Sequence, residues 1–255
     1  MVHFSPKTLD FLFENRMHNS KTWFDEHKEE YQSLVFEPLR DLVEYLTPTA
    51  LFIDPHLTTE ARVDKTISRI RRDTRFSHDK SLYRDNMWFI FRRGKMHGTS
   101  VPSLYFEITC DGFSYGSGFY CASTGYMDTM RKLVLKEDPL YLKAQNALEK
   151  NPVFHLEGEC YKRPHYKEKP EEMRNWLERR NICASADSAD FDLLFSDRLA
   201  ETLRQGFLAV APLYDFFLHT AQIFEAQDPH SAALFGSERA PEVGKAPVRE
   251  KQDMW

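Results

Sequence analysis

The residues best suited to chemistry in this sequence are cations, and they gather in one segment. Between Ala61 and Lys95 there are 11 Lys or Arg against 4 Asp, which is a local net charge of +7. The whole chain has a net charge of −5, so the residues outside this segment sum to −12. Guanidinium groups present fixed pairs of donors that match the oxygens of phosphate and carboxylate groups. The segment therefore predicts a compact site for an anion.

The candidate site residues lie in the middle of this segment, where bases alternate with aspartates. We expect the basic side chains to hold the anion and Asp73 and Asp79 to orient the arginines. Tyr83 and Asp73 are the nearby groups suited to proton transfer, but the sequence assigns no catalytic residue and does not decide whether the protein is an enzyme. The predicted ligand-binding residues are Lys65, Arg69, Arg72, Asp73, Arg75, Asp79, Lys80 and Tyr83.

Two other interpretations of the basic segment stay open. In one, the same acids and bases pair with each other and join the helices to the sheet. In the other, residues 62–95 form a convex, exposed strip with which a non-enzymatic protein docks an acidic partner or RNA. The pI of about 6.1 disfavours a general nucleic-acid binder, whose positive potential is usually spread widely. A small anionic ligand is therefore the partner we expect.

Other chemical signatures are weak. Ser77 to Lys80 contains S-x-x-K, but the S-D-N and K-T-G elements that accompany it in penicillin-recognising enzymes are missing. The 10 histidines form no H-E-x-x-H or H-x-H pattern, so we predict no metal site from the motifs, which leaves open a site assembled from distant residues. The stretch Gly116 to Gly118 lacks the rest of a dinucleotide fingerprint and indicates a bulge or a close backbone approach. No cofactor and no oligomeric state is indicated.

Composition predicts a globular protein. Of the 255 residues, 42% are hydrophobic, which is enough apolar surface to offset the entropy of ordering. The N-terminus shows no export signal, and the longest apolar runs fall short of the roughly 20 residues that span a bilayer. Four scattered cysteines without a C-x-x-C pair argue against disulfides and structural zinc. We therefore expect a cytoplasmic protein without membrane contact.

Helical periodicity dominates both ends of the chain. Ser5-Pro6 and Ser20 resemble helix N-termini, and Pro38 starts or kinks a further helix. Later helices are expected over residues 126–135, 139–150 and 170–179, and two more between residues 197 and 224 with a break or kink at Pro212.

The middle of the chain predicts strands instead. Aromatic and β-branched runs cover residues 88–91, 104–109 and 113–120, with a short strand at 153–157. Asp111-Gly112 is typical of a type I′ hairpin turn. Because strands are grouped, we predict an α+β fold with a central antiparallel β-meander covered by helices. It forms a single domain over residues 1–225, followed by a loosely ordered C-terminal tail over residues 226–255.

The basic segment also resembles a family signature. Lys65, the run Arg69-Ile70-x-Arg72-Asp73-x-Arg75-Phe76-Ser77-x-Asp79-Lys80 and Tyr83 resemble the pattern of a widespread, uncharacterised family, domain of unknown function 2461 (DUF2461). The similarity extends to Trp23-Phe24, to Gly118-Phe119-Tyr120 and to the segment from Pro212 to Phe217. Ser81 replaces a proline of the pattern, which affects the rigidity of the loop and not its charge. The resemblance implies one intact domain over roughly residues 3–222 and no known activity.

Overall fold

The computed structural model describes residues 3–75, 78–94 and 101–227, and its N-terminal part is helical. Pro6 opens the first helix, where Thr8 Oγ1 accepts a hydrogen bond of 3.0 Å from the Ser5 N–H. Ser20 Oγ accepts one from the Trp23 N–H, and Pro38 lies in the first turn of α4, so all three predicted helix starts are confirmed. The elements are α1 (Pro6–His18), α2 (Lys21–Glu26), α3 (Lys28–Tyr31), a π-helical turn η1 (Gln32–Phe36) and α4 (Glu37–Ile53).

The middle of the chain builds an antiparallel sheet with the strand order β1-β2-β3-β5-β4. Strand β2 pairs with β1 and β3, which confirms the predicted meander. Cys110 and Asp111 form the β2–β3 turn, and neither has a positive φ, so the hairpin is confirmed but its type I′ turn is wrong. The strands are β1 (Met87–Arg92), β2 (Ser103–Thr109), β3 (Gly112–Gly118), β4 (His155–Glu157) and β5 (Cys183–Ser188).

Strand β5 is the strand that the sequence does not predict. It consists of Cys, Ala, Ser and Asp, without the β-branched and aromatic residues that favour strands. It forms nevertheless because β3 and β4 pair with it on its two sides. A Cβ on Gly116 would overlap the carbonyl oxygen of Ala184 on β5, which confirms the predicted close approach at this glycine.

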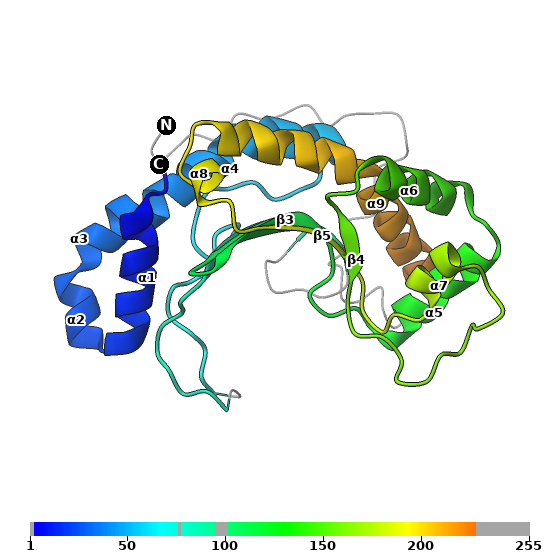
Figure 1. Ribbon diagram of the computed structural model, residues 1–255, viewed down its shortest axis with the longest axis horizontal. Coiled ribbons are helices and arrows are strands. Elements are labelled where there is room, and N and C mark those ends of the chain that lie inside the picture. The colour runs from blue at the N-terminus through cyan, green and yellow to red at the C-terminus, as the bar shows by residue number, and fades with distance from the viewer. Residues whose placement is uncertain (1–2, 76–77, 95–100, 228–255) are drawn as a thin grey trace.

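The C-terminal half adds helices around one end of the sheet and over one of its faces (Figure 1). Pro212 lies inside one continuous helix, which changes direction along its length, so the two expected helices are one. The helices are α5 (Thr124–Leu135), α6 (Pro139–Lys150), α7 (Glu171–Leu177), α8 (Phe191–Leu194) and α9 (Arg198–Gln227).

Helices α4 and α9 cover one face of the sheet (Figure 1). The strand side chains under them are buried and apolar, as alternation requires, and include Phe89, Phe91 and Phe106. A second buried cluster joins α5, α6 and α7 to the last turns of α9 around Trp176 and Phe217. Helix α9 thus contributes to both cores, and the α+β class is confirmed.

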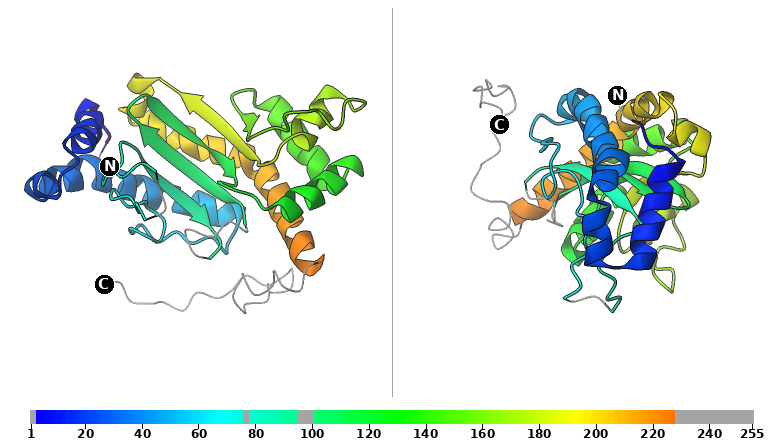
Figure 2. Two further views of the ribbon diagram at one scale, coloured as in Figure 1. Left: turned by 90° about the horizontal axis from the view of Figure 1, so that it is seen from below. Right: turned by 90° about the vertical axis from the view of Figure 1, so that its left-hand side faces the viewer.

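The opposite face of the sheet is open. No helix among the described residues lies against it, and the left view of Figure 2 looks onto it. Apart from Ile90, its larger side chains are polar or aromatic, and pairing aligns Trp88, Glu107, Ser114 and Asp187 in one row across four strands. A face of this kind, on a rigid sheet, is where ligand-binding groups can be displayed.

A buried ion pair fixes the covered face. Asp54, just after α4, is 3% exposed and accepts hydrogen bonds of 2.7 and 2.9 Å from Arg93. The hydroxyl of Tyr214 on α9 donates another at 2.5 Å, and the His56 N–H a fourth at 3.0 Å. Burial alone would raise the pKa of Asp54, but these hydrogen bonds lower it overall. The network ties α4, the end of β1 and α9 together.

Two further expectations concern the cysteines and the tail. All four cysteines are free, in agreement with the absence of a disulfide framework. Helix α9 is long and apolar enough to cross a bilayer by length and composition, but 12 of its residues are buried against the rest of the domain. The predicted tail, residues 226–255, lies outside the described residues from 228 onward.

Candidate functional site

The basic segment forms most of the long connection between α4 and β1. Its apolar residues anchor it: Ile67 and Ile70 are buried, and Ile67 makes a bridge to Phe89 on β1. A second bridge pairs Arg71 with Tyr83, so the segment folds back on itself. The charged side chains therefore point outward from a connection that is fixed at several points.

One group of predicted site residues is paired locally on the surface. Arg69 Nε lies 2.6 Å from Asp64 Oδ2, and Arg75 contacts Asp73 through two nitrogens, at 2.7 Å for Nη2. The Arg75 hydrogen bonds lower the pKa of Asp73 to about 2. Arg69 and Arg75 are 65% and 76% exposed. Lys65 contacts Glu60 at 3.6 Å in the same manner.

A second group gathers around Asp79. Arg72 donates to Asp79 Oδ2, and Arg16 of α1 donates to the same oxygen from 2.8 Å. The hydroxyl and the backbone N–H of Ser81 donate to Asp79 Oδ1. These Ser81 hydrogen bonds, followed by those of Arg72 and Arg16, lower the pKa of Asp79. Asp79 thus orients arginines as expected, and it also links the basic segment to α1.

Arg84 adds a third guanidinium beside this group. It lies over the ring of Trp88, 4.4 Å from the centroid, and its Nε donates to the carbonyl oxygen of Arg69 at 3.2 Å. Burial and the nearby charge of Arg72 lower the pKa of Arg84. Within the described residues it has no carboxylate partner. Arg84 and Arg16 were not among the predicted site residues, since neither alternates with the aspartates of the motif.

Two predicted site residues, Lys80 and Tyr83, belong to neither of these groups. Lys80 Nζ donates to the carbonyl oxygen of Thr74 at 2.9 Å. Tyr83 is 3% exposed and stacks on Phe24 of α2 with the ring centroids 5.0 Å apart. Burial raises the pKa of Tyr83, which makes it a poor proton donor at neutral pH. Tyr83 packs the segment against the N-terminal helices.

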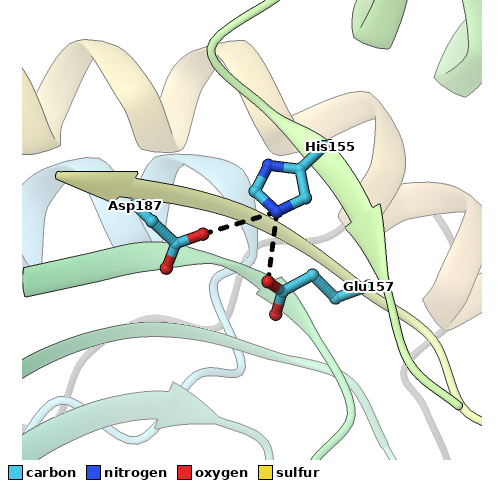
Figure 3. A group of neighbouring side chains, drawn as sticks. All are labelled: His155, Glu157 and Asp187. Atoms are coloured by element: carbon cyan, nitrogen blue, oxygen red, sulfur yellow. Dashed lines mark hydrogen bonds and ion pairs between the residues drawn. The ribbon is translucent and has the colours of Figure 1, made fainter.

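Another constellation lies on the open face of the sheet, and the sequence analysis missed it. His155 and Glu157 on β4 and Asp187 on β5 point toward one another (Figure 3). His155 Nε2 lies 3.1 Å from Glu157 Oε1 and 3.4 Å from Asp187 Oδ2. The signal in the sequence was His155-x-Glu157, which strand alternation places on one face. Its third member could not be found because β5 was not predicted.

Two hydroxyls support this constellation from beneath. Ser185, 1% exposed, directs its hydroxyl to Asp187 at 3.3 Å, and the Tyr105 hydroxyl donates to Ser185 Oγ at 2.8 Å. Burial raises the pKa of Tyr105, so its phenol keeps its proton. Tyr105, Ser185 and Asp187 form a connected polar chain that crosses from β2 to β5.

These features define an α+β domain whose antiparallel sheet is covered by helices on one face and displays polar groups on the other. The chain belongs to the DUF2461 family, described as conserved hypothetical proteins, because the family model matches residues 7–216. The resemblance noted in the basic segment is thereby confirmed. A search of curated proteins found no match.

Proposed function

We propose that the protein binds a small anionic ligand, bearing phosphate or carboxylate, at the guanidinium groups of Arg16, Arg72 and Arg84. The observation that supports this most directly is Arg84. Its guanidinium is held flat on Trp88, and its only hydrogen bond within the described residues uses Nε. The terminal nitrogens of a fixed guanidinium are well suited to bind two oxygens of one oxyanion.

The charged groups around Arg84 bear on the same proposal. Arg16 and Arg72 contact the carboxylate of Asp79, and Arg16 also lies 4.0 Å from Asp85, whereas Arg84 contacts neither carboxylate. Glu107 is a further negative charge near Arg84, so what this group offers an anion is the terminal donors of Arg84 rather than a net positive charge. The ring of Trp88 belongs to the open face of the sheet, so a bound ligand would extend over that face.

The basic-strip alternative has one observation in its favour, which is the high exposure of Arg69 and Arg75. However, each of these side chains already contacts an aspartate within five residues of it in the sequence. Their net charge is largely compensated on the protein itself. We therefore place the ligand at Arg72 and Arg84 and treat RNA or an acidic protein as outcomes that the experiment can reveal.

The experiment is a thermal-shift and calorimetric titration with inorganic phosphate and citrate at constant ionic strength. A ligand present at 100 times its Kd stabilises the native state by about 2.7 kcal/mol. We expect the shift in the wild type and its loss in Arg84→Gln and Arg72→Gln. Arg84→Lys keeps the charge without the paired donors, so it should bind more weakly than the wild type.

The matched control is Arg204→Gln, which removes the same charge from α9, where Arg204 pairs with Glu201 at 2.7 Å. It should retain the full shift. An equal shift in all variants would mean nonspecific binding and would contradict the proposal. Absence of any anion-dependent shift, together with binding of a short RNA, would favour the basic strip instead.

A further inference from the structure

We propose that His155, Glu157 and Asp187 form a binding site for a divalent transition-metal ion on the open face of the sheet. The three residues offer one imidazole nitrogen and two carboxylate oxygens, all within 4.8 Å of one another. This donor set suits Mn²⁺, Fe²⁺, Co²⁺ and Zn²⁺. The site is separate from the arginine cluster and does not depend on the proposed anion binding.

The two distances from the imidazole match those around one ion. Two ligand atoms that each lie about 2.1 Å from a metal are about 3.0 Å apart at a right angle and about 3.4 Å apart at the tetrahedral angle. Nε2 of His155 is 3.1 Å from Glu157 Oε1 and 3.4 Å from Asp187 Oδ2. An ion can therefore enter between these atoms with small side-chain rotations and without moving the strands.

The charges also favour a cation. Two carboxylates that lie this close repel each other unless a positive charge separates them. A divalent ion among the three side chains would neutralise both carboxylates.

The supporting residues resemble those that orient metal ligands elsewhere. Such ligands are usually held by hydrogen bonds from groups behind them. Here the Ser185 hydroxyl donates to Asp187, and Tyr105 in turn donates to Ser185. Because Ser185 is buried within the sheet, the position of the Asp187 carboxylate is fixed before any ion arrives.

The site is open on its outer side. The side chains of His155, Glu157 and Asp187 are each about half exposed, so the remaining coordination positions face solvent and are available to water or a ligand. The neighbouring thiol of Cys183 is not among the donor atoms that lie within 4.8 Å of one another. The donor set thus contains nitrogen and oxygen only.

The test is metal titration of the full-length protein after dialysis against a chelator. Binding of Mn²⁺ is followed by electron paramagnetic resonance of the free ion, and binding of Zn²⁺ by competition with a chromogenic chelator. We expect one site per chain. His155→Ala and Asp187→Asn should abolish it, and Ser185→Ala should weaken it by roughly 10-fold, as for the loss of an outer hydrogen bond.

The matched control is His3→Ala, because His3 forms a comparable imidazole–carboxylate pair with Asp197 at 2.7 Å but with a single carboxylate. It should bind metal as the wild type does. Circular dichroism melts of all variants show whether the fold is kept. The proposal is overturned if neither ion binds the wild type, or if His155→Ala and Asp187→Asn bind as tightly as His3→Ala.

Discussion

Asp54 and Asp79 each accept hydrogen bonds from an arginine of the same basic segment, yet they lie in opposite surroundings. Asp54 is 3% exposed and receives donors from Arg93, Tyr214 and the His56 N–H. The side chain of Asp79 is 42% exposed and receives donors from two arginines and Ser81. The two carboxylates have similar kinds of partner and differ in how deeply they are buried.

This difference distinguishes the arginine beside Asp54 from the arginines that we propose to bind an anion. At Asp54 the carboxylate is buried and both of its oxygens accept hydrogen bonds. Removing a partner therefore leaves a buried charge unpaired, which lowers the stability of the folded state. At Asp79 the carboxylate is near solvent, where ion pairs contribute little to stability, although Arg72 and Arg16 are 23% and 27% exposed, much as Arg93 is at 26%. The exposed carboxylate can therefore give up an arginine to an external anion, which is a requirement for binding one.

The largest effect is expected from Asp54→Asn. The substitution keeps the shape but leaves Arg93 without its carboxylate, and breaking a buried pair in this way costs about 3 kcal/mol. For a domain of this size the melting temperature should fall by roughly 6 to 12 °C. Denaturant unfolding provides the measurement. A loss no greater than that of an exposed Asp→Asn variant would show that burial does not distinguish the two carboxylates.

A smaller effect is expected from acid. The folded-state pKa of Asp54 lies below its ordinary value of 3.8, so the stability it contributes is complete above about pH 4 and is lost as the pH falls through the folded pKa. Asp54→Asn removes this titration. Unfolding free energies at pH 7, 4 and 3 in ~1 M salt, where surface pairs are screened, should fall less steeply for the variant. If the unfolding free energies of the wild type and of Asp54→Asn fell equally with pH, Asp54 would not be the source of this acid sensitivity.

Much of the fold could be predicted from the sequence because it rests on local signals. Proline and serine at helix starts, and aromatic runs bounded by glycines, specify α1, α4 and the meander. Strand β5 could not be predicted, because its Ala-Ser sequence becomes a strand only between β3 and β4. Pairing with distant strands overrides local propensity at this position.

The same distinction applies to the candidate sites. The basic segment was found because its residues are contiguous, but the contacts that its arginines make depend also on Arg16 and Trp88, which come from other elements. The His155 cluster was missed because Asp187 lies about 30 residues away on the unpredicted strand. A sequence pattern within one segment shows which side chains are present, but the pairing of strands determines which of them are in contact.

The smallest effect is expected from Asp79→Asn, the counterpart of Asp54→Asn. Asparagine can still accept the Ser81 hydrogen bonds, and the arginines it leaves are near enough to water to be solvated. We expect a slight loss of melting temperature at low salt that disappears in ~1 M KCl, where the Debye length is about 3 Å. Because Arg72 and Arg16 lose a competing carboxylate, phosphate should bind the variant at least as tightly as the wild type. A salt-independent loss as large as that of Asp54→Asn would instead make Asp79 a structural link between α1 and the basic segment, and the arginines around it would no longer be free to exchange partners.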